Sequence, residues 1–416
     1  MIKELKLKIW QYKILLENFS FLSILQVSNL LIFLVITPYL FRVLGKEYYG
    51  MVIFAQTVAT YFSILVNFGF TVTATRDISI NRNNSRTVSE IISTVLTLKI
   101  IFFVLSMVIL VFLLLTIPIF KSQPRLFLFS MLACLSDALF PIWYFQGIEK
   151  MKYISLINIF TRIFSAILIF FLVINPGDFI FVPLLLGSGY LLGALIGLWI
   201  VFYKHKHKFI FQTINNLKLS VKENFPMFIS NISTQIYVNA NKLISGSYLG
   251  MQELAIYDIA DKITYLLKIP VVMIGQTLFP RVSHDRDIRF LKKAMRYVFI
   301  FIIVIYLVVF ILSRPIINFF SGTINPEAEN LLRLLSVSLL PICLGLFFAE
   351  LLLIPFGKFI DYTRMRAFSL LLYLTIILLL FSFKQISLFQ LAITIIVVET
   401  FVLFYSYYLC KKNKIL

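Results

Sequence analysis

The sequence predicts an all-α polytopic membrane protein with about twelve transmembrane helices. Of its 416 residues, 60% are hydrophobic and only 14% are charged, whereas about a quarter of a soluble domain is charged. Apolar runs of roughly 20 residues, enough for a helix to cross a hydrocarbon layer of about 30 Å, recur along the chain. Little sequence remains between them, which argues against a separate soluble domain.

The apolar runs form two sets separated by a basic connection. The first six spans are expected at residues 21–41, 48–70, 98–120, 126–146, 154–174 and 179–202. The second six are expected at residues 225–249, 254–279, 294–312, 334–356, 365–383 and 386–409. A helix satisfies its own backbone hydrogen bonds, as the hydrocarbon requires. We therefore predict an N-terminal six-helix bundle over 1–203, a cytoplasmic linker over 204–224 and a C-terminal six-helix bundle over 225–416.

The positive charge of the chain is unevenly distributed. The net charge is +19, from 38 Lys and Arg against 19 Asp and Glu. One set of alternate connections holds 26 of the basic residues and the opposite set holds 7. By the positive-inside rule, both termini are expected in the cytoplasm. Topology thereby accounts for the charge, and no nucleic acid partner is expected.

The sequence contains few signals of an enzyme or a metal site. Cys134, Cys343 and Cys410 lie far apart in apolar runs, which favours small core residues. His205 and His207 lie in a basic connection with no third ligand in view. No phosphate-cradling Gly-Lys-Ser/Thr motif occurs, and the outward connections are short. We expect a non-enzyme without a cofactor, and the sequence leaves coupling to H+ or Na+ open.

The two halves resemble each other weakly at a constant offset. An offset that spans six helices keeps both halves in the same orientation, which implies parallel repeats about an axis along the membrane normal. The matched positions, 205 residues apart, are Leu44-Gly45 and Leu249-Gly250, Ala55 and Ala260, and Arg76 and Arg281.

Polar stripes mark the seventh and eighth spans. At about 100° per residue, each stripe is about 120° wide. The seventh-span stripe contains Asn231, Thr234, Gln235, Asn241, Lys242 and Ser245, and the eighth-span stripe contains Asp258, Asp261, Lys262, Tyr265 and Lys268. Charges at membrane depth are costly unless they are paired or face water. Counted from the short turn near Gly250, Lys242 and Asp261 are each about eight residues deep in their spans, so they are at matching depths and can meet as an ion pair. Such pairs either join helices or line a hydrated cavity.

Cations inside the spans suggest an anionic ligand. Lys242, Lys262 and Lys268, with Arg162 on the fifth span, offer positive charge to an anionic head group. Asp258 and Asp261 are either their counter-ions or titrating groups of a proton-coupled cycle. Further polar groups are the neutral second-span stripe of Gln56, Thr60, Ser63 and Asn67, and the acids Asp137, Glu350 and Glu399. These acids have either a proton or cation role or a role in hydrogen bonding between helices.

Short motifs in the first two spans resemble a known family. They are Pro38-Tyr39-Leu40, Arg42-Val43-Leu44-Gly45, Tyr49-Gly50, Phe68-Gly69-Phe70 and Ala74-Thr75-Arg76. In the second half, Asn224-Phe225-Pro226, Tyr257, Ala260 and Lys262 add to the pattern. The chain resembles the polysaccharide transporter family of Wzx-type O-antigen flippases, within the multidrug/oligosaccharidyl-lipid/polysaccharide (MOP) exporter superfamily. The motifs cover about a quarter of the chain, and Asn67 departs from the Asp that many relatives carry there.

The resemblance implies a MATE-like fold and a transport function. The implied cargo is an oligosaccharide on undecaprenyl pyrophosphate, moved by alternating access from the cytoplasmic to the periplasmic leaflet of a bacterial inner membrane. Lys242, Lys262, Lys268 and Arg162 would then contact the head group, and Asn231, Gln235, Asn241, Gln56 and Asn67 would bind sugar. Asp258 and Asp261 would switch partners, Arg76 and Arg281 would capture pyrophosphate or anchor helices, and Arg42 would gate or anchor.

Two alternatives remain open at the level of sequence. One is a multidrug or cation antiporter of the same superfamily, for which a more acidic site would be expected. The other is a membrane O-antigen polymerase, which the short outward connections disfavour. Membrane lipids and the polymerase and chain-length machinery of the same pathway are the expected partners.

Overall fold

The computed structural model describes the backbone of residues 2–285 and 287–415. The side chains of residues 2–19, 22, 230, 276, 280, 281 and 283–285 are outside the description. The described residues form helices joined by turns and short connections, which confirms the predicted all-α fold. They divide into two compact units, residues 1–48 with 54–231 and residues 49–53 with 232–416.

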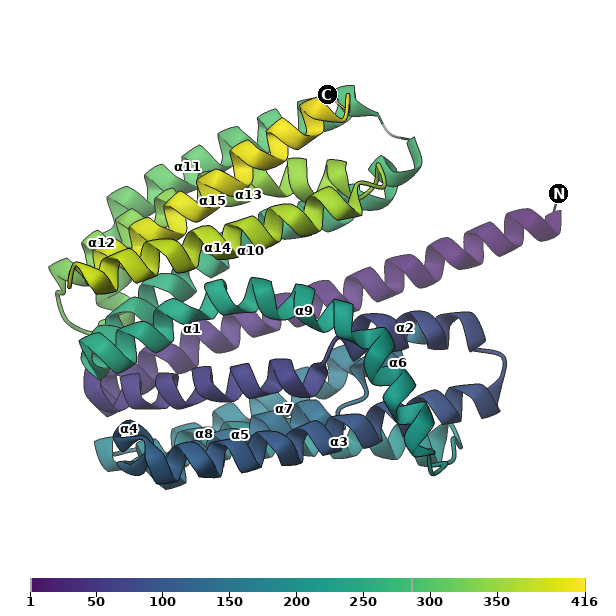
Figure 1. Cartoon of the computed structure of the whole chain (residues 1–416), viewed down its shortest axis with the longest axis horizontal. Helices are drawn as coiled ribbons and strands as arrows, with labels where there is room; N and C mark the ends of the chain where they lie inside the picture. Colours follow the sequence, from purple (N-terminus) through teal and green to yellow (C-terminus); the bar gives the residue numbers. More distant parts are fainter. Residues whose placement is uncertain (1, 286, 416) are drawn as a thin grey trace. The chain divides into compact units, whose positions relative to one another are not determined.

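The first unit contains most of the first nine helices (Figure 1). They are α1 (Ile2–Asn67), α2 (Phe70–Asn81), α3 (Ser85–Thr116), α4 (Pro118–Lys121), α5 (Pro124–Leu139), α6 (Ile142–Gly147), α7 (Met151–Leu172), α8 (Phe181–Trp199) and α9 (Ile214–Ile244). The short turns η1 (Pro176–Ile180) and η2 (Ile200–Lys204) flank α8. Polar side chains set several boundaries: Asn84, for example, precedes α3 and accepts a hydrogen bond from the Thr87 amide.

Close helix packing in the first unit depends on glycine. A Cβ on Gly189 of α8 would lie 1.9 Å from Ser165 Oγ and 2.8 Å from the Thr161 carbonyl oxygen of α7. At Gly197, a Cβ would lie 3.0 Å from Pro141 Cδ. The spacing of small residues along α8 therefore allows its neighbours to approach closely, as in other membrane helices.

The second unit contains the end of α9 and all later helices. They are η3 (Ser245–Leu249), α10 (Met251–Asp285), α11 (Ile288–Ser321), α12 (Pro326–Val337), α13 (Leu339–Phe348), η4 (Ala349–Leu353), α14 (Phe359–Ser382) and α15 (Leu388–Lys412). Asp287 caps α11 by accepting from the Phe290 amide, and Asn325 caps α12 by accepting from the Ala328 amide. The boundary between the units falls inside α9, which begins at Ile214, within the stretch predicted as a linker over 204–224.

Two glycines 205 residues apart interrupt the helices in the same way. Gly45 has φ 72° and ψ 171°, and it breaks α1 into two passes. Gly250, between η3 and α10, has φ 112° and ψ 167°. Glycine adopts positive φ without the Cβ penalty, so each sharp break occurs at the residue that tolerates it. The local geometry thus matches the offset seen in the sequence.

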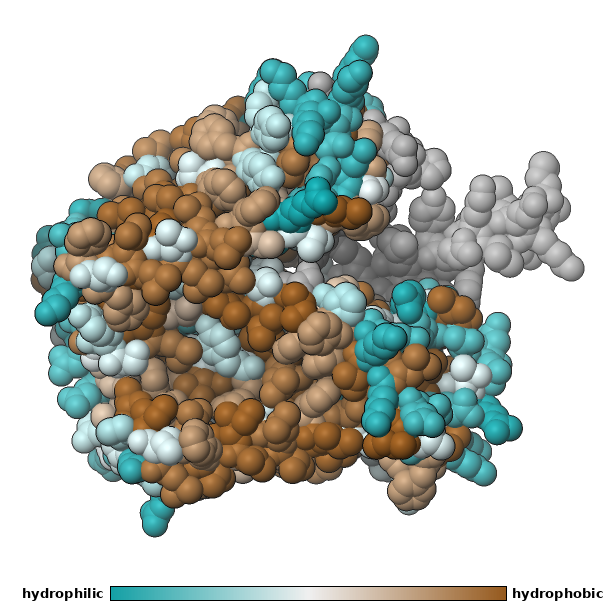
Figure 2. Space-filling model, in the orientation of Figure 1, coloured by the Kyte–Doolittle hydropathy of each residue, from teal (hydrophilic) through white to brown (hydrophobic). Residues whose placement is uncertain are grey.

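The helices are long and apolar enough to span a membrane. In the described chain there are ten candidate spans, of which the first, Ser23–Asn81, includes the break at Gly45 and so covers two of the predicted crossings. The polar helix α9, predicted as the seventh crossing, is not among the ten. Figure 2 shows that hydrophobic surface covers the middle of the helices in each unit, while hydrophilic residues gather toward their ends.

Candidate functional site

The second unit contains a buried charge cluster centred on Asp258 of α10. Its side chain is only 1% exposed, and three groups surround its carboxylate. Lys242 Nζ lies 3.0 Å from Oδ1, and Lys262 Nζ lies 2.7 Å from Oδ2. The Tyr49 hydroxyl donates to Oδ2 at 2.8 Å. Both oxygens of this carboxylate are therefore occupied, as a buried charge requires.

Lys242 connects two carboxylates. Its Nζ lies 3.0 Å from Asp258 Oδ1 and also 3.0 Å from Asp261 Oδ2. The side chain of Lys242 is 14% exposed, whereas that of Asp261 is 36% exposed. The predicted meeting of Lys242 and Asp261 is confirmed, and Asp258 is an additional partner. Asp261 is the more accessible of the two acids.

The segment Tyr49–Ile53 of α1 belongs to this unit and supplies a third side of the cluster. Lys262 Nζ donates to the Tyr49 hydroxyl at 3.1 Å and lies 5.5 Å from the centre of its ring. A Cβ on Gly50 would lie 1.9 Å from the Met251 carbonyl oxygen, so only glycine permits this approach to the start of α10. The Tyr49-Gly50 pair thereby joins a close backbone approach to a charge contact.

A neutral network lies beside the ion pairs on α9. Asn241 is fully buried and donates to the Tyr257 hydroxyl and the Leu391 carbonyl oxygen, each at 3.0 Å. The Tyr373 hydroxyl donates to Asn241 Oδ1 at 2.7 Å. These contacts link α9, α10, α14 and α15. They also occupy the amide that was expected to bind sugar, so in this conformation Asn241 is a structural link within the unit.

A further cation of this unit, Arg366, was not predicted as a site residue. Arg366 of α14 donates to the Tyr237 hydroxyl at 3.0 Å and lies 3.5 Å from Glu350 Oε1 of η4. Its guanidinium also lies 5.3 Å from the ring centre of Tyr362. In the sequence, Arg366 stands at the start of the span expected at 365–383, so its position gave no signal of a site at membrane depth. The signal that would have indicated this contact is the acid Glu350, which needs a partner at membrane depth.

The other predicted site residues of α9 and α10 lie outside the ion pairs. Lys268 stacks over the Tyr265 ring, with Nζ 5.4 Å from the ring centre. Asn231 and Gln235 of α9 are exposed, and Asn239 donates to the Gln235 side-chain oxygen at 3.1 Å. The two amides predicted for sugar binding therefore remain accessible. Lys268 offers a cation that is not held by a carboxylate among the described residues.

Gln56 and Arg162 belong to the first unit, where they line two adjoining pockets. The pocket beside Gln56 measures about 270 Å³ and the one beside Arg162 about 200 Å³. Asp137 and Tyr190 line both pockets. Arg162 Nε is buried and has no hydrogen-bond partner in the described structure. The buried Lys99 donates to the Asp137 carbonyl oxygen at 2.8 Å.

The remaining predicted residues are not gathered at either location. Asn67 donates to the Ser63 carbonyl oxygen at 2.9 Å on its own helix. Arg76 is exposed and paired with Asp77 at 2.8 Å, and Arg42 is exposed on α1. The Arg281 side chain lies outside the described residues. The gating or anchoring roles of these arginines remain predictions.

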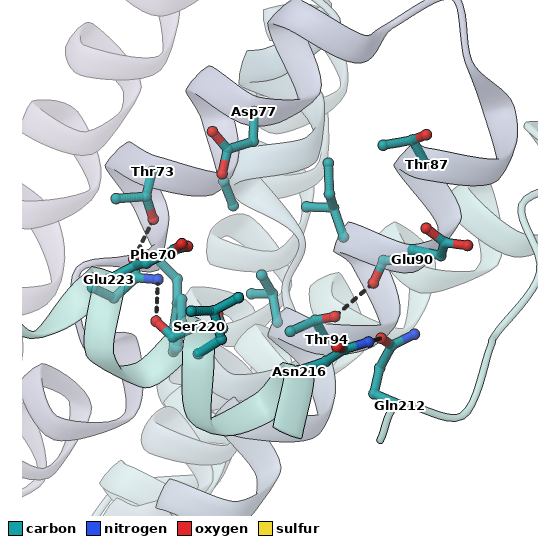
Figure 3. A pocket seen from close by; sticks show the side chains of 15 residues that line it. Phe70, Thr73, Asp77, Thr87, Glu90, Thr94, Gln212, Asn216, Ser220 and Glu223 are labelled. Carbon is teal, nitrogen blue, oxygen red and sulfur yellow. Dashed lines mark hydrogen bonds between the residues drawn. The ribbon is translucent and has the colours of Figure 1, made fainter. Parts of the chain in front are cut away.

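A third pocket of the first unit, about 240 Å³, opens between α2, α3 and α9 (Figure 3). Asp77, Glu90 and Glu223 line it together with Gln212. A hydrogen bond from Thr73 to Asn224 joins α2 to α9 at its wall. Its acids would repel the anionic head group that the sequence predicts as a ligand, so this pocket does not fit that ligand.

The histidines of the basic connection face protein groups. The Tyr144 hydroxyl lies 2.8 Å from His205 Nδ1 and 3.0 Å from His207 Nε2, and Ser89 Oγ lies 3.1 Å from His207 Nδ1. Burial, followed by the nearby positive charges of Lys150 and other groups, lowers the pKa of His205 to about 4. Burial also lowers the pKa of His207. Among the described residues, no cluster of three His, Cys, Asp or Glu side chains is placed to hold a metal ion.

Comparison with known proteins identifies the family. Residues 15–284 match the family described as "Polysaccharide biosynthesis protein". The chain belongs to this family. A protein of Escherichia coli strain K12 named "Putative O-antigen transporter" is 28% identical over 267 residues, 64% of this chain and 64% of that protein. A protein of Shigella dysenteriae with the same name is 26% identical over 283 residues, 68% of this chain and 70% of that protein.

Solved structures show the same fold. The lipid II flippase MurJ in an inward closed conformation aligns with TM-score 0.69 and 18% identity, covering 93% of this chain and 87% of that chain. An inward-facing MATE family transporter of the MOP superfamily aligns with TM-score 0.64 and 13% identity, covering 93% and 98%. The predicted MATE-like fold and family resemblance are confirmed. With the apolar helices, they indicate a multi-pass protein of the bacterial inner membrane.

Proposed function

We propose that this protein is a flippase that carries undecaprenyl-pyrophosphate-linked oligosaccharide repeat units from the cytoplasmic to the periplasmic leaflet by alternating access. The observation that carries the proposal is the charge cluster of Lys242, Asp258, Asp261 and Lys262 inside a membrane-spanning unit. A diphosphate needs cations while it crosses a low-dielectric layer. The names of the curated relatives support an O-antigen cargo.

Asp261 is the member of the cluster that is best suited to be replaced by a ligand. Asp258 is buried and holds Lys242, Lys262 and the Tyr49 hydroxyl, so its removal would leave several groups unsatisfied. Among the described residues, Asp261 forms an ion pair with Lys242 alone, and its side chain is 36% exposed. We therefore expect the diphosphate to replace Asp261 on Lys242. Since an ammonium has three donors, Lys262 retains one that can reach the same ligand.

The loaded and unloaded states of the carrier then differ in the partner of Lys242. When diphosphate leaves, Asp261 returns to Lys242 and neutralises it, so the unloaded site contains no uncompensated charge. Exposed amides on α9, Asn231 and Gln235, are placed to contact sugar in the same helix face. The lipid tail remains in the bilayer, because hydrocarbon surroundings suit it. Orientation follows the positive-inside prediction, with both termini in the cytoplasm.

The test is a lipid analysis of a strain that lacks this gene. We expect complete single repeat units on undecaprenyl pyrophosphate to accumulate, inaccessible to probes outside spheroplasts, and surface polysaccharide to disappear. Mass spectrometry of extracted lipids measures the first effect and cell-surface staining the second. Units that appear outside but remain unpolymerised would place the protein after flipping and would support the polymerase alternative.

Point variants returned to that strain test the cluster. Lys242→Glu is expected to abolish export at normal protein abundance, whereas Lys121→Glu, the same charge reversal at an exposed position on α4, is expected to restore it. Because three neighbouring acids can prevent folding, the neutral pair Lys242→Gln with Asp261→Asn serves as a second variant. It keeps the Asp258–Lys262 pair and should insert but not export. Normal export by both Lys242 variants would contradict the proposed head-group role.

A cation antiporter remains the second candidate, and Asp137 is the observation that favours it. Its exposed carboxylate and Tyr190 line two adjoining pockets of the first unit, which would suit an organic cation. Arg162 in the same pocket opposes that fit. Efflux of a fluorescent organic cation from vesicles distinguishes the two functions. The flippase proposal predicts no efflux, whereas efflux that depends on Asp137 would support the antiporter in place of the flippase.

A further inference from the structure

The second unit contains an apolar groove of about 710 Å³. Its floor is α13, through Leu344 and Phe348, and its walls are α11 and α15. On α11 the groove residues follow one helical face, because Lys292, Arg296 and Phe299 are spaced four and three residues apart. The groove is therefore a continuous feature of three packed helices.

Charge is confined to one end of this groove. Lys292 and Arg296 lie in the first turns of α11, and Lys411 lies in the last turn of α15, which runs antiparallel to it. From Lys292 to Phe299 the helix rises by roughly 10 Å, so the wall changes from cationic to aromatic over that distance. Among the described lining residues none is acidic, and none of the three cations is in an ion pair within the described structure.

The apolar part of the groove is built for a flexible chain. Phe299, Phe404 and Tyr407 border it, and Tyr407 packs against Phe348 in an edge contact with ring centres 5.4 Å apart. Phe404 is 65% exposed and Phe299 is 40% exposed. These accessible rings can pack against an acyl chain through van der Waals contacts.

We propose that this groove binds one anionic glycerophospholipid, with its phosphate on Lys292, Arg296 and Lys411 and an acyl chain along α13. The argument for this occupant is charge complementarity: three cations with no ion-pair partner among the described residues lie at one end of a hydrocarbon-lined groove. Basic pockets between membrane helices on the cytoplasmic side bind anionic head groups, and arginine holds phosphate through two parallel hydrogen bonds. The groove contains none of the residues assigned to the cargo, so this inference is independent of the proposed function.

Native mass spectrometry of the full-length protein in detergent tests the proposal. Dioleoyl phosphatidylglycerol is expected to bind at least ten-fold more tightly than dioleoyl phosphatidylethanolamine, and raising the salt concentration should narrow the difference. The groove variant Lys292→Gln, Arg296→Gln, Lys411→Gln is expected to lose that ten-fold preference. All three side chains are exposed, so the fold should persist.

The matched control removes three exposed cations from the same region that do not line the groove. It is Lys293→Gln, Lys412→Gln, Lys414→Gln, and its phosphatidylglycerol affinity should stay within two-fold of the original. A third variant, Leu344→Trp, fills the groove floor without changing charge and should weaken phosphatidylglycerol binding as well.

Three outcomes would overturn the proposal. Equal losses of phosphatidylglycerol affinity in the groove variant and the control variant would indicate diffuse attraction to surface charge. Equal binding of the two phospholipids would show that the head group is not recognised. Displacement of phosphatidylglycerol by an equimolar amount of undecaprenyl phosphate would assign the groove to the polyprenyl lipid instead.

Discussion

The polar helix faces of the two units start from related sequence positions but differ in structure. Gln56 lies 205 residues before Asp261, and each is on a polar stripe that follows a glycine break. In the second unit, opposite charges contact one another and leave Asp258 only 1% exposed. In the first unit, Gln56, Thr60 and Ser63 line a pocket of about 270 Å³. Coulomb attraction in a low dielectric draws the charged side chains of the second unit together. The neutral groups of the first unit bond to their own helix, so a pocket remains beside them.

The difference indicates how each unit is stabilised. Thr60 donates to the Gln56 carbonyl oxygen of its own helix at 2.9 Å, so this contact connects no second element. Lys242 and Asp258 join α9 to α10. The first unit instead depends on close helix packing, as at Gly189. Charge deletion should therefore damage the second unit, and added side-chain volume should damage the first.

The largest effect is expected from Asp258→Ala. The change leaves Lys242 with only the accessible Asp261 and deprives Lys262 of its carboxylate, so the free energy of unfolding should fall by about 3–5 kcal/mol. Denaturant unfolding in detergent, followed by tryptophan fluorescence or circular dichroism, measures it. The control Thr60→Ala in the first unit should stay within about 0.5 kcal/mol. Equal stability of the two variants would show that the cluster is energetically neutral.

A somewhat smaller effect is expected from Gly189→Val. The new Cβ would overlap Ser165 Oγ and the Thr161 carbonyl oxygen, which should cost about 1–3 kcal/mol in the free energy of unfolding. Adding Ser165→Ala should restore part of the loss, because it removes the hydroxyl that makes the closest of these contacts. Gly177→Ala, where a Cβ meets nothing within 4 Å, is the matched control. A loss at Gly177 equal to that at Gly189 would argue against tight packing as the cause.

A third variant places the acid of the second unit at its repeat position in the first. Gln56→Asp should lower the free energy of unfolding by about 1 kcal/mol, because none of the described residues that line this pocket is a cation that could pair with the new carboxylate. Its matched partner Asp261→Gln should also cost about 1 kcal/mol, since Lys242 retains Asp258. The same unfolding assay applies to both. A stabilised Gln56→Asp protein would show that the first unit already contains a suitable cation.

The smallest effect is a pH dependence of the connection after η2. Burial lowers the pKa of His205 to about 4, below the ordinary value of about 6.5, so the folded connection favours the neutral imidazole, which lies 2.8 Å from the Tyr144 hydroxyl. Its contribution is complete above pH 6.5 and is lost as the pH falls toward 4. Hydrogen exchange of amides 205–213, corrected for the intrinsic pH dependence, should accelerate severalfold over that window. In His205→Asn this acceleration should be weaker, and an unchanged profile would contradict the assignment.

Some of the site followed from pattern alone. The depth of Lys242 and Asp261 below the same turn predicted their contact, because a helix has a constant rise and the membrane requires partners for charges. The cysteines are buried, as expected from their apolar surroundings. The contact between Tyr49 and Asp258 was not predicted, because the two residues are far apart in the sequence and a hydroxyl group does not indicate which partner it will bind. The expectation that Asn241 faces sugar could not anticipate the tyrosines that satisfy its amide.

By itself the sequence determined the class of fold, the repeat and the family, because span length, apolar content and glycine at positive φ depend on local chemistry. Apart from the Lys242–Asp261 pair, the partners of the polar groups were decided only by the tertiary structure. The stripe on α10 leaves open which acid is shielded, and packing against Tyr49 and Lys242 makes Asp258 the buried one. Likewise, the basic residues of α11 and α15 form one rim only because antiparallel packing on α13 brings them together. Such contacts join distant segments, so their energies belong to the assembled helices rather than to any one of them.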